Sequence, residues 1–260
     1  MSCWVRDKIR SDVLRAPILL KDCKMGTQAE GTKFMPVHLQ REIESLKKEI
    51  LTCGAMAEQS VRDATRAIEQ KNEALARRVI EKDIDLDQME VEVEESCLKI
   101  LALYQPVAID LRFIIAALKI NNDLERVGDL AVNIAERALF LATCPEVNIE
   151  FDFTTMAAKT QEMLKKSLDA LVNLNAQLAR EVCACDDEID AMNRQMYLIV
   201  QDAVSTHPDQ VEPLIHLLSA SRHLERIADH ATNIAEDVIY MIEGEIVRHK
   251  AEEYKPLTQF

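Results

Sequence analysis

Eight carboxylates, arranged as four pairs with members four residues apart, are the side chains best suited to chemistry. They are Asp83 and Asp87, Glu125 and Asp129, Asp186 and Asp190, and Glu225 and Asp229. Residues four apart share one face of a helix, where two like charges repel by about 0.2–0.5 kcal/mol. A bound cation removes that repulsion, and oxygen ligands suit hard or borderline metal ions. The spacing therefore predicts metal binding by these pairs.

The pairs lie in a sequence that occurs twice. Residues 121–140 read NNDLERVGDLAVNIAERALF, residues 221–240 read SRHLERIADHATNIAEDVIY, and nine of the twenty aligned positions are identical. Upstream the match continues at an offset of 103 residues, which aligns the aspartate pair of the first half with that of the second. The chain is therefore predicted to be an internal duplication.

The composition favours an all-α fold. Among 260 residues there are 5 Gly and 7 Pro, too few for the turns of a sheet protein, and 48% of residues are hydrophobic. Each half is predicted to form three helices, over residues 37–70, 72–104 and 106–141, and over residues 152–175, 176–206 and 208–248. Short connections favour antiparallel neighbours, so the predicted fold is a tandem pair of antiparallel three-helix bundles with six long helices.

The third predicted helix of each half carries apolar residues at alternating spacings of three and four. In the first half these are Ala117, Ile120, Leu124, Val127, Ala131, Ile134, Ala138 and Leu141; in the second they are Leu217, Ala220, Leu224, Ile227, Ala231, Ile234, Val238 and Met241. Such a seam packs against neighbouring helices at a shallow angle. At about 100° per residue the acidic pairs lie nearly opposite the seam.

Folding the first half at Pro106 brings the carboxylates of its last two helices to one level. Asp87 and Glu125 lie about 18 and 19 residues from the turn, and Asp83 and Asp129 about 22 and 23. In the second half, folded at its own proline, the corresponding separations are about 17 and 21 residues. Antiparallel helices rise equally per residue, so four carboxylates of each half are expected at one height.

The predicted domain organisation follows the duplication. Residues 35–143 form the first three-helix repeat and residues 144–250 the second, with residues 251–260 as a tail. Residues 1–34 lack a sustained period and precede an internal methionine, Met35, so we interpret them as a disordered leader or a mis-annotated start.

Charge and hydropathy exclude several classes of function. A net charge of −14 argues against nucleic-acid binding, which relies on Lys and Arg, and it permits cation binding. No run without Asp, Glu, Lys or Arg is longer than that of residues 170–179, which is short of the ~18–20 residues of a membrane span. No secretory signal is present. Any membrane association is therefore expected to be peripheral, through partners.

Three strings resemble those of the PhoU family of phosphate-signalling regulators. They are QPVAIDLR at 105–112, DLERVGDLAVNIAE at 123–136 and HLERIADHATNIAE at 223–236, and the resemblance extends over nearly all of the chain from about Met35. It implies a cytoplasmic, commonly dimeric adaptor between the ATPase of the phosphate ABC transporter and a membrane histidine kinase. It also implies repression of phosphate-starvation genes when phosphate is plentiful.

The resemblance also bears on the metal. Some family members bind multinuclear iron or other metals through E/D-x-x-x-D pairs, which the glutamate-aspartate pairs of this chain match directly and the aspartate pairs match by position. The implied ion is iron or another divalent metal such as Zn, Mn or Mg. His230 stands where the first copy has Leu130, so the two sites need not bind alike.

Two other functions compete with that of a non-enzymatic regulator. A di-iron carboxylate enzyme also uses a helical bundle, but typically through Glu-x-x-His elements, and no such tetrad occurs here. The other is a metal-independent helical scaffold, in which Arg126 and Arg226 form ordinary ion pairs with the aspartates three residues later. We assign no catalytic residue and no organic cofactor.

A row of histidines and a first-turn acid are given structural roles. His216, His223 and His230 recur every seven residues on one helical stripe, and we expect them to face solvent rather than to form a ligand row. Asp110, close after Pro106, is expected to interact with the positive end of the helix dipole.

Overall fold

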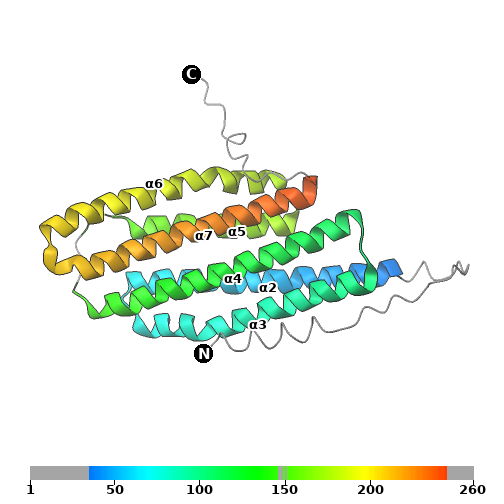
Figure 1. The fold of residues 1–260 in the computed structure, drawn as a ribbon, viewed down its shortest axis with the longest axis horizontal. Helices are drawn as coiled ribbons and strands as arrows, with labels where there is room; N and C mark the ends of the chain where they lie inside the picture. The colour runs from blue at the N-terminus through cyan, green and yellow to red at the C-terminus, as the bar shows by residue number, and fades with distance from the viewer. Residues whose placement is uncertain (1–34, 146–148, 150, 245–260) are drawn as a thin grey trace, which may run out of the picture. The chain divides into compact units, whose positions relative to one another are not determined.

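The computed structural model describes residues 35–145, 149 and 151–244, and these form the all-α fold that the sequence predicted (Figure 1). The long helices of the first half are α2 (Met35–Glu69), α3 (Glu73–Tyr104) and α4 (Ala108–Thr143). Those of the second half are α5 (Phe153–Asn173), α6 (Ala176–Thr206) and α7 (Val211–Glu243), with the 3-10 helix η1 (Pro208–Gln210) before α7. The interpretation of residues 1–34 falls outside the described residues.

Equivalent caps begin the middle helix of each half. Asn72 accepts a hydrogen bond from the backbone N–H of Leu75 at 3.0 Å, and Asn175 accepts one from Leu178 at 3.1 Å. An asparagine at this position satisfies an N–H group that has no partner within the helix. The two asparagines are 103 residues apart, so the duplication includes the cap that starts each hairpin.

The third helices begin later than predicted. Gln105 has a left-handed backbone conformation (φ 46°) and Val107 is extended (φ −127°, ψ 159°), so Pro106 lies in the turn and α4 begins at Ala108. In the second half the proline opens η1 instead, and α7 begins at Val211. Each proline therefore marks the turn correctly but lies outside the α-helix.

The core confirms the predicted seams. All eight seam residues of α4 are buried, as are seven of the eight on α7, where Leu217 is partly buried. Most of them belong to one hydrophobic cluster that contains residues from every helix of both halves. The core is therefore continuous across the duplication. None of the described helices has the length and apolar character needed to cross a membrane.

Helices α4 and α7 join the halves. They lie side by side and run antiparallel in Figure 1, and each also packs against the middle helix of its own half. Lys119 Nζ lies 3.0 Å from Asp237 Oδ1, and the ring of Phe140 stacks on that of His216 at 3.9 Å. A residue near the start of α4 thus contacts one near the end of α7, and a residue near the end of α4 contacts one near the start of α7. Antiparallel packing requires this order.

Candidate metal centre

A hydrogen bond between equivalent positions of the last two helices fixes the hairpin register in each half. Asn121 Nδ2 on α4 donates to the backbone carbonyl of Glu90 on α3 at 2.8 Å. At the equivalent positions, Ser221 Oγ on α7 donates to Asn193 Oδ1 on α6 at 3.0 Å. In each half these contacts set the two helices antiparallel in the register that brings the predicted carboxylates to one level.

A glycine allows α3 and α4 to approach closely beside the first cluster. A Cβ atom placed on Gly128 would overlap Leu86 Cδ2 and would lie 3.3 Å from Asp83 Oδ1. The second half has Ala228 and Ile189 at the positions of the glycine and the leucine, and both are buried. The close contact places the Asp83 carboxylate beside the backbone of α4.

The four predicted carboxylates of the first half interact electrostatically. Burial, followed by the charges of Asp87 and Asp129, raises the pKa of Asp83 to about 6. Burial is also the largest cause that raises the pKa of Glu125, followed by the charge of Asp129, while Arg126 opposes the shift. These carboxylates from α3 and α4 therefore form one group, which we call the first acidic cluster.

The second half repeats this arrangement in the second acidic cluster. Burial and then the charges of Asp229 and Asp190 raise the pKa of Asp186 to about 6, although Thr232 Oγ1 donates a hydrogen bond to Asp186 Oδ1 at 3.4 Å. The pKa values of Glu225 and Asp229 are also raised, with burial as the largest cause. In both halves, therefore, burial makes the ionised form of these carboxylates less favourable.

The carboxylates of the clusters lie opposite the apolar seams, but they are not all open to solvent. The side chain of Glu125 is only 12% exposed, because α3 packs beside it, whereas Asp129 is 45% exposed. Arg126 contacts both, with Nε 3.4 Å from Glu125 Oε2 and Nη1 3.2 Å from Asp129 Oδ2. In the second half Arg194 lies 3.4 Å from Asp190. Arginines therefore already supply part of the compensating charge.

The donor set fits a hard divalent cation by type, because each cluster offers four carboxylates at one level. Across the described residues, however, no three His, Cys, Asp or Glu side chains are placed so that together they could hold a metal ion as they stand. The structure thus brings the predicted ligands together in two groups of four without making their oxygens converge. Metal coordination requires changes in side-chain conformation at these positions.

The histidine row faces the other half rather than solvent, which corrects our expectation. His216 stacks on Phe140 of α4, and burial with nearby arginine charges lowers the pKa of His223 to about 4. His230 Nδ1 lies 2.8 Å from Asp123 Oδ1, and its side chain is 17% exposed. These residues lie where α7 meets α4, so their seven-residue spacing reflects helix packing.

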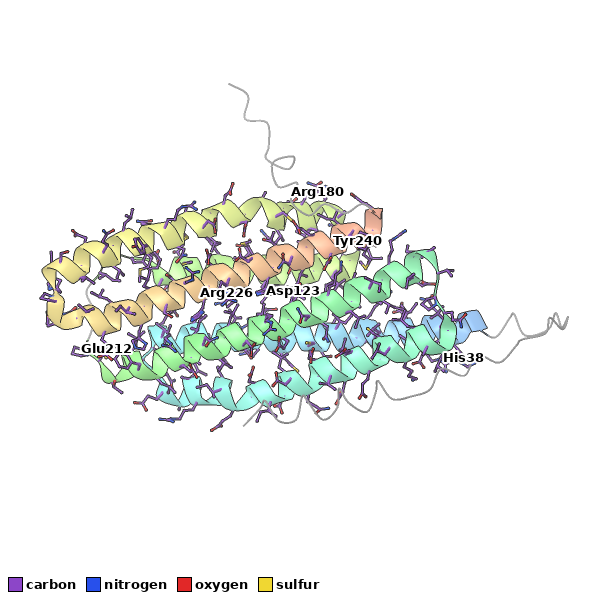
Figure 2. The ribbon with its side chains drawn as sticks, viewed as in Figure 1. His38, Asp123, Arg180, Glu212, Arg226 and Tyr240 are labelled. Atoms are coloured by element: carbon purple, nitrogen blue, oxygen red, sulfur yellow. The ribbon has the colours of Figure 1, made fainter. Side chains whose placement is uncertain are left out.

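Sequence reasoning missed the polar contacts between α4 and α7. Figure 2 shows Asp123 in the region where these helices meet, and Asn233 Nδ2 also donates to its Oδ1 at 3.4 Å. Asp237, which is 3% exposed, pairs with Lys119. One feature of the sequence could have indicated these contacts. Asp237 lies seven residues after His230 and so continues the spacing of the histidines.

Comparison with known proteins supplies the family context. The model of the PhoU domain matches residues 50–138 and again residues 153–238. A phosphate-specific transport system accessory protein PhoU homolog from Clostridium acetobutylicum is 37% identical over 209 residues, covering 80% of this chain and 95% of the relative. A homolog of the same description from Aquifex aeolicus is 38% identical over 212 residues, covering 82% and 96%.

Solved structures agree with this match. The crystal structure of PhoU from Pseudomonas aeruginosa is similar with a TM-score of 0.76 at 34% identity, covering 80% of this chain and all of that one. The phosphate transport system regulatory protein PhoU from Streptococcus pneumoniae is similar with a TM-score of 0.71 at 28% identity, covering 80% and 99%. The similarity extends across both three-helix halves.

Proposed function

Because this chain belongs to the PhoU family, we propose that it is a non-enzymatic, metal-binding regulator of phosphate uptake and phosphate-starvation signalling in the cytoplasm. Its accessory role in phosphate transport is supported by the names of the relatives, which are phosphate-specific transport system accessory proteins. In this role it contacts the ATPase of the phosphate ABC transporter and a sensor histidine kinase, as a homodimer, and it keeps starvation genes silent when phosphate is plentiful.

The observation that carries the metal-binding part is the duplicated grouping of carboxylates with raised pKa values. Asp83 is held near two other carboxylates and Asp186 near three, where burial and like charge make ionisation unfavourable. A divalent cation, iron or alternatively Zn, Mn or Mg, would supply the positive charge that offsets this repulsion. The four acids of each cluster would hold it, and they belong to the last two helices of each half.

Metal binding by these residues would act on the hairpins. The ligands of each cluster come from two helices, so a shared ion would fix α3 against α4 and α6 against α7. Because α4 packs on α7, both hairpins would be held around the central pair of helices. The chain's own residues would thereby present an acidic surface of fixed shape to protein partners.

Specific contacts favour a metal-independent scaffold as the second candidate. Arg126 already contacts Glu125 and Asp129, and the side chains of the clusters do not converge on one point. In a scaffold, these ion pairs alone would balance the acidic faces. Purified protein that retains no divalent metal, yet still represses starvation genes, would favour this alternative.

A reporter assay tests the regulatory function. A phosphate-starvation promoter is followed in phosphate-rich medium in a strain that lacks this protein, and then with the wild-type chain restored. We expect the promoter to be active without the protein and silent when it is restored. A promoter that stays silent without the protein would contradict the proposed regulation.

A second pair of strains assigns the role of the acidic clusters. One carries amide replacements at all eight predicted ligands, and the matched control carries Asp169→Asn and Asp202→Asn, two exposed acids of α5 and α6. We expect the first variant to lose repression while remaining helical, and the control to keep it. If the two variants repress the promoter equally, the acidic clusters have no role in regulation.

A further inference from the structure

Helix α3 exposes a stripe of large apolar side chains along its outer face. Ile84, Val91 and Leu98 are 73%, 44% and 54% exposed. They are spaced by seven residues, which places them on one line nearly parallel to the helix axis. The stripe extends over about 21 Å at the helical rise of about 1.5 Å per residue.

The duplication shows that the fold does not require this stripe. At the equivalent positions of α6, 103 residues later, the side chains are Asp187, Arg194 and Gln201, and all three are exposed. The equivalent stripe of α6 is therefore polar in the second half. Exposed large apolar residues that form a row, rather than lying singly, indicate an interaction site.

The charges beside the stripe restrict what can cover it. Between Glu81 and Lys99, α3 carries eight carboxylates and two lysines, a net charge of −6. Glu81, Asp85 and Glu92 are exposed along one side of the stripe, and Glu94 is exposed on the other. Lys99 lies 2.9 Å from Glu42 of α2, so its positive charge is already balanced within the chain.

We propose that the outer face of α3 is a docking surface for a basic amphipathic helix of another protein. The row of apolar residues at seven-residue spacing would receive the apolar face of that helix, and the flanking carboxylates would pair with its Lys and Arg side chains. A second copy of α3 would bring like charges together, and an anionic membrane surface would be repelled for the same reason.

This inference deepens the adaptor function proposed above by naming a surface and the chemistry of its partner, and it does not require bound metal. Opposite charge across the contact speeds association and excludes acidic partners. The restriction to α3 implies that only the first half offers this surface, although the two halves have the same fold.

Site-specific photo-crosslinking in cells tests the proposal on the full chain. A photoreactive amino acid replaces Gln88, an exposed residue within the stripe, and in the matched control it replaces Ala191, its exposed equivalent on α6. Crosslinked peptides are identified by mass spectrometry. We expect the probe at position 88 to capture a Lys- and Arg-rich amphipathic segment of another protein, and the probe at position 191 not to capture it.

Several outcomes would overturn the proposal. Crosslinks from position 88 to a second copy of this chain, to residues 1–34 of the same chain, to lipid, or to an acidic segment would each assign a different occupant. The absence of any crosslink would leave the surface without a partner. The reporter strain keeps the two proposals distinguishable, because a promoter silent without the protein contradicts the regulatory function whatever position 88 contacts.

A peptide titration isolates the stripe from the rest of the acidic surface. The probe is a synthetic helical peptide with leucine at seven-residue spacing and lysine flanks, and its glutamate analogue is the control ligand. We expect Ile84→Ser, Val91→Ser and Leu98→Ser together to weaken binding of the lysine peptide by about tenfold or more. Tyr197→Ser with Leu198→Ser, which removes exposed apolar residues from α6, should leave it unchanged. Equal weakening by both variants, or equal binding of both peptides, would contradict the proposal.

Discussion

Asp83 of α3 and Asp186 of α6 occupy equivalent positions, 103 residues apart, and burial with neighbouring carboxylates raises the pKa of each to about 6. Each aspartate lies near its own partner four residues later and near an aspartate of the following helix. The two halves have thus kept an electrostatically unfavourable arrangement in common. A bound cation is the simplest way to make that arrangement favourable.

The stability of the metal-free protein should depend on pH through these two aspartates. A raised native pKa means that the folded state binds more protons than the unfolded state between about pH 4 and pH 6. Stability from this source is therefore present at low pH and is lost as pH rises through about 6. We expect a loss on the order of 1–2 kcal/mol for each group, allowing for solvent screening.

Urea unfolding at pH 5 and pH 7.5 in the presence of a chelator measures this effect. The variant with Asp83→Asn and Asp186→Asn should lose less stability over that interval than the wild type, because it cannot lose those protons. Asp85→Asn, at an exposed position of α3, serves as the control. Identical pH profiles for the double variant and the wild type would contradict the assignment.

The ion pair between the halves should contribute strongly to stability. Asp237 is 3% exposed and Lys119, its partner across α4 and α7, is 37% exposed. Lys119→Met removes the charge that balances a buried carboxylate, and we expect a loss of about 1–3 kcal/mol in the free energy of unfolding. Lys166→Met is the matched control, since that lysine is also 37% exposed but pairs with an exposed glutamate on its own helix. If both variants lose the same free energy of unfolding in chemical denaturation, the burial of Asp237 does not strengthen its ion pair.

Gly128 should be intolerant of a methyl group as long as Leu86 faces it. Gly128→Ala improves helix propensity by up to about 1 kcal/mol, but overlap with the leucine side chain costs more. We expect a net loss of about 1–2 kcal/mol in thermal or urea unfolding. Adding Leu86→Ile reproduces the combination of Ile189 and Ala228 in the second half and should recover part of the loss. A double variant no more stable than Gly128→Ala would contradict this explanation.

The fold and the register of the clusters were predictable because both depend on backbone periodicity. The heptads identified the buried faces of α4 and α7, and the prolines located the turns. Counting residues from Pro106 then placed Asp87 level with Glu125 without any knowledge of side-chain positions. The late start of α4 was not predictable, because it depends on the left-handed conformation of Gln105.

The side-chain arrangement was less predictable, because it depends on contacts between residues far apart in the sequence. Nothing near His230 indicates that Asp123, more than a hundred residues earlier, is its hydrogen-bond partner. The placement of α7 against α4 partly buries a histidine row that would otherwise face solvent. Arg126 could be paired in advance with Asp129, but its second contact with Glu125 depends on the side-chain conformation in the folded chain.

Metal content of the purified protein tests the central claim most directly. The wild type, a first-cluster variant with Asp83→Asn, Asp87→Asn, Glu125→Gln and Asp129→Asn, and the control with Asp85→Asn and Glu92→Gln are compared by elemental analysis after equal exposure to divalent metals. We expect the wild type and the control to retain metal, and the first-cluster variant to lose the share held by the first half while its helix content is unchanged. Equal metal content in all three proteins would contradict the assignment of the acidic clusters as metal sites.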